Sequence, residues 1–149
     1  MVKSKPTTKK IVNRRAKYDY ELGDSLVVGI QLTGPETKAL RSGHGQLRGS
    51  YVALKDNELW LINAMIGAVA NGFVKNIDQT RTRKLLAKRR EIEKLGLDKQ
   101  KNLSIVPLEF LTSGQYIKLK IAIGRGKKRY DKRQTIKARE EKRRIARIS

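Results

Sequence analysis

Alternating apolar and polar residues predict two long strands. Apolar side chains occupy every second position over 26–32 and again over 117–123, where Lys118 and Lys120 fall between them. A period of two is typical of a strand that buries only one of its faces. We therefore expect the second strand to bury its aliphatic side chains and to present both lysines on the outer face of a sheet.

Three shorter apolar segments predict further strands. Residues 51–54 and 59–63 flank four polar residues and predict a hairpin with a loop of about four residues. Residues 103–112 predict another strand, which Pro107 interrupts. Because proline has no amide hydrogen to give to a sheet, this strand should lie at an edge or contain a bulge.

The tetrapeptide Thr33-Gly34-Pro35-Glu36 is typical of the start of a helix. Thr33 or Gly34 can cap the first amides, Pro35 suits the first helical position, and Glu36 complements the positive end of the helix dipole. A short helix is therefore predicted over 35–42.

A second helix is predicted over about 80–95, with Asp78 or Thr80 as its cap and Gly96 as its end. Its apolar stripe consists of Leu85, Leu86, Ile92 and Leu95. Its other faces carry the basic residues Arg81, Arg83, Lys84, Lys88, Arg89 and Arg90. Such a helix is amphipathic, with one face against the body and a strongly cationic surface.

Together these elements indicate a mainly-β protein whose antiparallel strands form a small barrel or sandwich, with two short helices. The chain divides into a flexible basic N-terminus (1–12), a body (13–123) and a basic C-terminal tail (124–149). The tail has few large aliphatic residues, so it should be disordered or only transiently helical when it is free. Residues 64–75 are small, apolar and broken by glycines, and they favour no particular structure.

The charge of the chain is large and unevenly distributed. Basic residues outnumber acidic ones by 35 to 14, for a net charge of +21. Residues 1–17 contribute +7, residues 81–94 contribute +5 and residues 124–149 contribute +9, so the remainder is neutral. Three separate basic segments predict shaped contacts with a polyanion, which is either a nucleic acid or an anionic membrane surface.

Membrane insertion and secretion find no support in the sequence. No apolar stretch approaches the roughly 20 residues that a membrane-spanning helix needs. The basic N-terminus is not followed by the apolar segment of a secretory signal. The chain also lacks cysteine, which excludes disulfides, thiolate metal sites and cysteine nucleophiles and fits a reducing cytoplasm.

Residues that could support catalysis are few. His44 is the only imidazole and stands in a glycine-rich segment, which is more typical of a plain loop residue. The acidic residues are scattered, and segment 124–128 lacks the spacing and the Ser or Thr of a phosphate-binding loop. We therefore predict a protein that is not an enzyme and that uses no cofactor or metal.

The types of basic residue favour RNA as the partner. Arginine makes bidentate contacts with phosphate and stacks on bases, and it outnumbers lysine four to three over 81–94. Tyr130 stands between two basic clusters and could stack on an unpaired base. Aromatic residues are otherwise scarce, so contacts with the shape and phosphates of folded RNA fit better than stacking along a single strand. A merely solvated tail is the alternative.

Short motifs along most of the chain resemble the SsrA-binding proteins, also called small protein B. The two longest are Thr80-Arg81-Thr82-Arg83-Lys84-Leu85-Leu86 and Gly126-Lys127-Lys128-Arg129-Tyr130-Asp131-Lys132-Arg133. Shorter ones are Asn13-Arg14-Arg15-Ala16, Gly29-Ile30-Gln31-Leu32-Thr33-Gly34, Lys38-Ala39-Leu40-Arg41, Ser50-Tyr51-Val52 and Lys137-Ala138-Arg139-Glu140. Their combination and their order over about residues 11–145 are very specific to that family.

The resemblance implies a closed antiparallel Greek-key barrel related to the oligonucleotide-binding fold, with short flanking helices and a basic tail that is helical when bound. It implies an RNA-binding adaptor of trans-translation, which binds the tRNA-like domain of transfer-messenger RNA and delivers it to stalled ribosomes. The tail then occupies the small-subunit decoding centre, with its 16S ribosomal RNA, and the empty messenger channel. The resemblance also implies a cytoplasmic protein that is a monomer in this complex.

Two sets of binding residues follow from the same resemblance. The surface for transfer-messenger RNA consists of Asn13, Arg14, Arg83, Lys84, Leu86, Lys118 and Lys120. The tail set, for the decoding site and the messenger channel, consists of Gly126, Lys127, Lys128, Tyr130, Asp131, Lys132, Arg133, Lys137, Arg139, Arg143 and Arg144. Val27 stands where family members usually carry an acidic residue, so one carboxylate contact with a base or ribose is missing here.

Two other functions are compatible with this size and charge. A constitutive small ribosomal protein would bind ribosomal RNA and remain in stoichiometric amounts on salt-washed ribosomes. An RNA-modifying enzyme would need a general base or a nucleophile, for which the sequence offers no candidate. For RNA binding itself, affinity should fall steeply with salt, with a log–log slope of about −5 to −9 if roughly 6–10 phosphates are neutralised.

Overall fold

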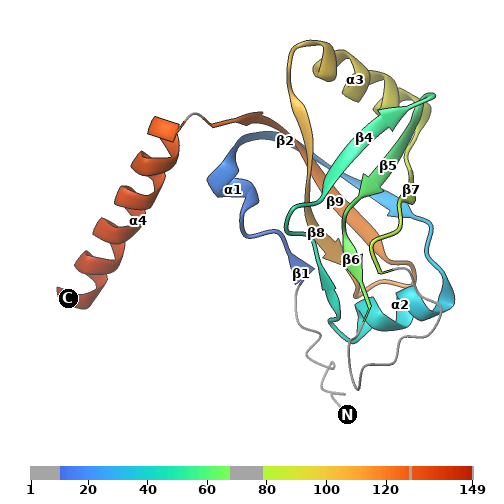
Figure 1. The fold of residues 1–149 in the computed structure, drawn as a ribbon, viewed down its shortest axis with the longest axis horizontal. Helices are drawn as coiled ribbons and strands as arrows, with labels where there is room; N and C mark the ends of the chain where they lie inside the picture. The colour runs from blue at the N-terminus through green and yellow to red at the C-terminus, as the bar shows by residue number, and fades with distance from the viewer. Residues whose placement is uncertain (1–10, 68–78, 128, 149) are drawn as a thin grey trace.

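The computed structural model describes residues 11–67, 79–127 and 129–148 of the 149-residue chain. Figure 1 shows a body built mostly of antiparallel strands, from which a C-terminal helix projects. The flexible start expected over 1–12 falls largely outside the described residues, and so does much of the segment 64–75.

The main sheet curves into a near-closed ring. Its strands are β1 (Ile11–Val12), β2 (Tyr20–Ile30), β4 (Tyr51–Lys55), β5 (Glu58–Ile62), β7 (Arg83–Leu86), β8 (Ser104–Leu111) and β9 (Lys118–Gly126). Neighbouring strands are antiparallel in the order β1-β8-β4-β5-β7-β2-β9, and β9 pairs back onto β8. The seam between β4 and β8 is short and joins Val52 to Ile105. Two further strands, β3 (Gly45–Gln46) and β6 (Met65–Ile66), form a separate small sheet.

Aliphatic side chains fill the inside of the ring and form its hydrophobic core. On β9, Leu119 and Ile121 are fully buried, whereas Lys118 is exposed and Lys120 is half-buried on the outer side. This confirms the alternation predicted for that part of the chain. Because burial of each such aliphatic side chain contributes roughly 1.5–3 kcal/mol, the apolar positions decide which side of the strand faces inward.

The hairpin of β4 and β5 is confirmed, but its turn is tighter than predicted. Lys55 and Glu58 pair with each other, which leaves Asp56 and Asn57 as a two-residue turn. Both residues have positive φ angles, of 54° and 60°. A type I′ turn requires this left-handed conformation, and Asp and Asn are among the residues that tolerate it.

The interruption at Pro107 is a bulge in β8. The pairing of β8 with β9 shifts its register between Pro107 and Glu109. β8 is not an edge strand, because it pairs with β1, β4 and β9. Of the two alternatives predicted for this proline, the bulge is therefore the correct one.

The described residues contain four helices: α1 (Ala16–Asp19), α2 (Gly34–Arg41), α3 (Arg89–Gln100) and α4 (Arg129–Ile148). α2 confirms the helix predicted over 35–42, displaced by one residue. Thr33 and Glu36 form a capping box at its start. The Thr33 hydroxyl accepts a hydrogen bond from the Glu36 amide, and the Glu36 carboxylate accepts one from the Thr33 amide.

The helix predicted over 80–95 is wrong in its first half. Residues Arg83–Leu86 form β7, which pairs with β5 on one side and with β2 on the other. A helix here would leave the facing edges of β2 and β5 unpaired, so strand pairing overrides the local preference for helix. Gly96 does not end α3, which continues to Gln100.

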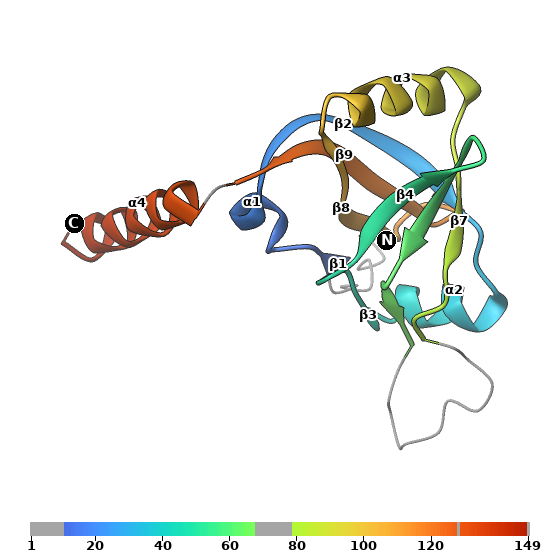
Figure 2. The ribbon, with the colours of Figure 1, turned by 45° about the horizontal axis from the view of Figure 1, so that its top comes forward.

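α4 projects from the ring as a single helix (Figures 1 and 2). This continuous helix of 20 residues differs from the disordered or transiently helical tail that we expected. Its run of Ala138, Arg139, Glu140 and Lys142 consists of good helix formers, which favour the helix even without a packed apolar face. None of the helices in the described parts of the chain is long and apolar enough to cross a membrane.

Candidate nucleic-acid interface

Strand pairing brings apolar and cationic side chains together on the outer side of the ring. Gly29 of β2 pairs with Leu86 of β7 on one side and with Lys118 of β9 on the other. Further along β2, Val27 pairs with Lys120. Leu86 is 47% exposed and Val27 is 43% exposed, which is high for aliphatic side chains. We call these five residues the Lys118 face.

The middle position of the Lys118 face, Gly29, has little room for a side chain. A Cβ atom at this position would lie 3.2 Å from the Cβ atom of Leu86. Because Gly29 has no side chain, Leu86 packs directly against the backbone of β2, and no side chain stands between Leu86 and Lys118. The two lysines of the face can neutralise phosphates. The face therefore combines an apolar surface for sugars and bases with cations for the RNA backbone.

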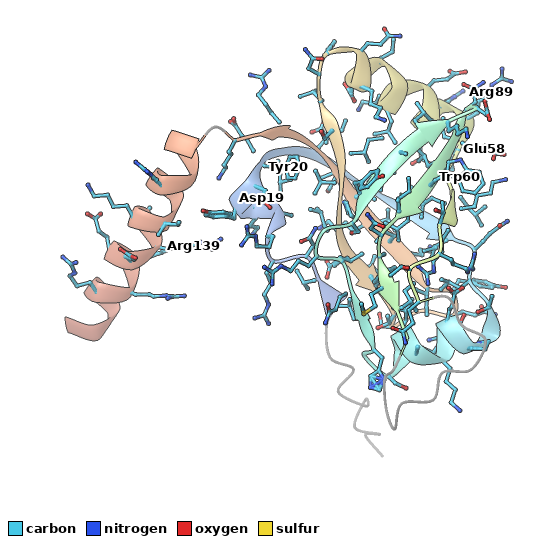
Figure 3. All side chains as sticks on the ribbon, viewed as in Figure 1. Asp19, Tyr20, Glu58, Trp60, Arg89 and Arg139 are labelled. Carbon is cyan, nitrogen blue, oxygen red and sulfur yellow. The ribbon has the colours of Figure 1, made fainter. Side chains whose placement is uncertain are left out.

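Lys84 also points outward from β7, but it lies beside a carboxylate. Its Nζ atom is 2.9 Å from Oε1 of Glu58 on β5. Its partner across the ladder is Trp60, which Figure 3 labels together with Glu58. Both members of the ion pair are partly exposed, so the pair contributes little to stability. It does hold the Lys84 ammonium on the β5 side of β7, away from the Lys118 face.

Arg83 lies in the interior, which corrects the expectation that it contacts RNA. Its side chain is 0% exposed, and its Nε atom donates to Glu36 at 2.6 Å. Its other guanidinium nitrogens donate to the backbone carbonyls of Ala64 and Gln79, at 2.9 and 3.0 Å. Side chains alternate along a strand, so an outward Lys84 requires an inward Arg83. Arg83 therefore positions the start of β7 instead of reaching the surface.

Glu36 is the buried carboxylate that joins α2 to the start of β7. It is 1% exposed and accepts hydrogen bonds from Arg81, Arg83 and the Thr33 amide. Burial by itself raises the pKa of Glu36. The hydrogen bonds from Arg81, Thr33 and Arg83, together with the charge of Arg83, outweigh burial and hold this pKa below its ordinary value.

Sequence reasoning missed Glu36 as the partner of the arginine motif. The only local signal was its role in the helix cap, and that role says nothing about residues about fifty positions away. In a chain with so few acidic residues, a buried carboxylate that pairs with two arginines is a structural element of the ring.

Asn13 is also buried and links the start of the body to β8. Its side-chain amide donates to the Pro107 carbonyl at 2.9 Å, and its backbone amide donates to the Leu108 carbonyl at 2.7 Å. Both carbonyls belong to the β8 bulge, where the ladder is interrupted. Asn13 is only 9% exposed, so little of it is available to RNA. Its neighbour Arg14 is exposed and lines a surface hollow together with Lys120.

The basic tail begins where the ring ends, since Gly126 is the last residue of β9 and Lys127 follows it. The exposed tail cations predicted as binding residues are Arg133, Lys137, Arg139, Arg143 and Arg144. Outside the described structure lie Lys128 and the side chains of Tyr130, Asp131 and Lys132. The stacking role of Tyr130 stays a prediction.

The fold and the interface define a class of protein. In the part of the chain that the structure describes, no three acidic, histidine or cysteine residues are grouped so that they could hold a metal ion. The outer side of the ring carries the Lys118 face, which is both cationic and apolar. A basic helix, α4, follows the last strand of the ring. This combination is that of a nucleic-acid-binding β protein whose contacts are made by shape and charge.

Comparison with known proteins identifies the family. The SmpB protein family matches residues 10–149, so the chain belongs to this family, whose members are RNA-binding proteins and not enzymes. The SsrA-binding protein of Trichormus variabilis is 45% identical over 137 residues, which cover 91% of this chain and 88% of that protein. The SsrA-binding protein of Chlamydia caviae is 45% identical over 141 residues, or 93% of this chain and 94% of that protein. The resemblance found in the sequence is thereby confirmed.

A solved structure is also similar to this chain. It is described as "tmRNA-SmpB: a journey to the center of the bacterial ribosome", and its TM-score is 0.67 at 36% sequence identity. The similarity covers 85% of this chain and 94% of the other. The near-closed antiparallel ring with its accompanying helices is thus an SmpB-like structure.

Proposed function

We propose that this protein binds transfer-messenger RNA and acts with it on stalled ribosomes in trans-translation. The observation that carries the proposal is the Lys118 face, where an exposed leucine, an exposed valine and two lysines lie around Gly29 on the outer side of the ring. The relatives are named SsrA-binding proteins, and the similar solved structure concerns tmRNA and SmpB in the bacterial ribosome. Both findings support the same partner.

The tRNA-like domain of this RNA is the proposed ligand of the Lys118 face. Lys118 and Lys120 contact phosphates, and Arg14 extends this cationic surface beyond β8. Leu86 and Val27 pack against ribose or against the face of an unpaired base. Because Val27 cannot accept a hydrogen bond from a ribose hydroxyl, this chain relies on its phosphate contacts at that point.

We infer further that the ring is a closed Greek-key barrel related to the oligonucleotide-binding fold. The pairing of β9 back onto β8 and the continuous hydrophobic core support closure. Proteins with that fold bind nucleic acids on an outward strand face and its flanking loops, and the Lys118 face has such a location.

For the tail, we propose a place in the decoding centre and in the empty messenger channel of the small subunit. α4 has 20 residues and so a length of about 30 Å. Its exposed lysines and arginines suit the phosphates of 16S ribosomal RNA. Tyr130 then stacks on a base of the decoding site. In this proposal the protein acts in the cytoplasm, as one copy in the complex and without a cofactor.

Two variants test this division between body and tail. Truncation after Lys127 keeps all of β9, so it should weaken binding of the tRNA-like domain by no more than a few-fold but abolish peptide tagging on stalled ribosomes. Lys118→Glu in the full chain should lower the affinity for the tRNA-like domain about ten-fold or more, because it turns attraction to a phosphate into repulsion. Filter binding and a reconstituted tagging reaction measure the two properties.

Normal tagging by the truncated protein would contradict the role of the tail, and unchanged RNA binding by Lys118→Glu would contradict the role of the face. A constitutive ribosomal protein, in contrast, would stay in stoichiometric amounts on ribosomes washed in high salt. Quantitative mass spectrometry of such ribosomes separates this alternative from a factor that is recruited only to stalled ones.

A further inference from the structure

The junction between the ring and the tail is held on α1. Directly after β9, the backbone amide of Lys127 donates to the Asp19 carbonyl at 2.9 Å. The Lys127 ammonium donates to the Lys17 carbonyl, also at 2.9 Å. These two bonds fix the place where the chain leaves the ring, so α4 begins beside α1 and not at an arbitrary distance from the body.

A hollow of about 470 Å³ lies at this junction, between α1, the outer side of β8 and β9, and α4. We call it the junction hollow. Its charged lining residues are Arg14, Lys17, Lys120, Arg139 and the single acid Glu109. Figure 3 labels Arg139 on α4 and Asp19 on α1, the helix of the body that lies toward α4. The hollow therefore collects cations from both the body and the tail.

The charges of the junction hollow are unbalanced. Among the described residues, Arg14, Lys17, Lys120 and Arg139 form no ion pair, and the nearby Asp19 is paired with Arg15 at 3.7 Å. Four positive groups thus face one carboxylate. Like charges around a shared concave surface repel one another and concentrate anions there.

We infer that the junction hollow binds a phosphate group of the RNA backbone, held by Arg14 and Lys120 from the body and by Arg139 from the tail. Lys120 belongs to both the hollow and the Lys118 face, so a strand that crosses the face reaches the hollow without a break. This continuity with an RNA-binding surface favours a phosphodiester over an anionic lipid headgroup. Two arginines also suit the bidentate geometry of phosphate recognition.

RNA bound to the body would therefore restrict the position of the tail relative to the ring. Without RNA, the two bonds of Lys127 hold the start of the tail on α1. With RNA, a phosphate also joins Arg139 to the ring. This inference rests on the RNA-binding function proposed above. It extends that function, because it gives Arg139 a role on the tRNA-like RNA before the tail meets the ribosome.

A double-mutant cycle tests the shared phosphate. Arg139→Ala and Arg14→Ala should each weaken binding of the isolated tRNA-like RNA by roughly two- to five-fold and reduce the log–log salt slope by about one. If both arginines hold one phosphate, the double variant should bind much more tightly than the product of the two losses predicts. Arg143 is the matched control, since it is an exposed arginine of α4 that does not line the hollow. When Arg143→Ala is combined with Arg14→Ala, the loss of affinity should equal the product of the two single losses.

A distance measurement tests the effect on the tail. The chain contains no cysteine, so two introduced cysteines, Lys101→Cys on the body and Lys142→Cys on α4, can carry spin labels without a background. The tRNA-like RNA should narrow the distribution of distances between the labels in the parent protein and in Arg143→Ala. It should fail to do so in Arg139→Ala.

The outcomes separate the two proposals. If the parent protein does not bind the tRNA-like RNA, the proposed function itself is overturned. If it binds with normal affinity but Arg139→Ala behaves as Arg143→Ala does in both experiments, only the junction hollow is overturned. Loss of binding to phosphatidylserine vesicles in Arg139→Ala, with RNA binding intact, would overturn it in favour of a membrane contact.

Discussion

Arg83 and Lys118 are both cations on strands of the same ring, but they point to opposite sides of the sheet. Arg83 is fully buried and is held by Glu36 and by three backbone carbonyls. Lys118 is exposed on the outer side. Basic residues of one sheet can therefore have a structural or a functional role. Side chains alternate along a strand, so the inward positions stabilise the fold and the outward positions are available to RNA.

Loss of the buried cation should have the strongest effect on stability. Arg83→Met should lower the free energy of unfolding by about 3–5 kcal/mol, because it removes the fully buried partner of a buried carboxylate. Urea denaturation followed by circular dichroism measures this loss. Lys118→Met is the matched control and should change the free energy by less than about 0.5 kcal/mol. Wild-type stability in Arg83→Met, with weakened RNA binding, would reverse our assignment.

Acid should weaken the same buried cluster. The pKa of Glu36 is lowered in the folded protein from its ordinary value of 4.5, so its ionised carboxylate stabilises the fold at all pH values above that ordinary value, which the unfolded chain retains. This contribution is lost as the pH falls further, through the folded pKa. Glu36→Gln should therefore be less stable by about 3 kcal/mol at neutral pH and lose less of its stability in acid.

Unfolding free energies measured from pH 7 down to pH 3 test this. Glu58→Gln removes a carboxylate from an exposed ion pair and should retain the steep acid loss of the parent protein. If Glu36→Gln loses stability in acid as steeply as the parent, another carboxylate is responsible.

A smaller effect is expected at the link between β1 and the β8 bulge. Asn13→Ala removes the donor to the Pro107 carbonyl and should cost about 1–3 kcal/mol of stability, because that buried carbonyl loses its partner. Thermal unfolding measures the change. Arg14→Ala, one residue along the chain and exposed, should leave stability unchanged and reduce only RNA affinity. The reverse pattern in the two variants would place Asn13 in the RNA interface.

Loss of the exposed cation should change RNA binding and leave the fold intact. Lys118→Ala should weaken binding of the tRNA-like RNA about three- to ten-fold, uniformly across RNA sequences, and reduce the log–log salt slope by about one. Filter binding at several salt concentrations measures both quantities. Lys101→Ala, an exposed lysine outside the Lys118 face, should bind like the parent protein. Equal losses in the two variants would mean that only overall charge matters.

Structural features that depend only on residues close together in the chain could be predicted from the sequence. The capping residues of α2 and the alternation along β9 are determined by contacts within a few positions, and the missing amide hydrogen of Pro107 implied either an edge or a bulge. β7 could not be predicted in this way. Its residues prefer helix locally, and they form a strand because β2 and β5 present edges that need a partner.

The residues of the candidate site likewise fall into those predicted from the sequence and those that depend on contacts between distant elements. The sequence by itself determined the family, the basic character of the partner surface, and the outward direction of Lys118 and Lys120, since motif order and a period of two need no partner element. Only the tertiary structure decided that Arg83 is internal and that Leu86 faces outward beside Gly29. Those outcomes depend on strand pairing and on the burial of Glu36, 47 residues away from Arg83. Residues so distant in the chain meet only when the ring forms.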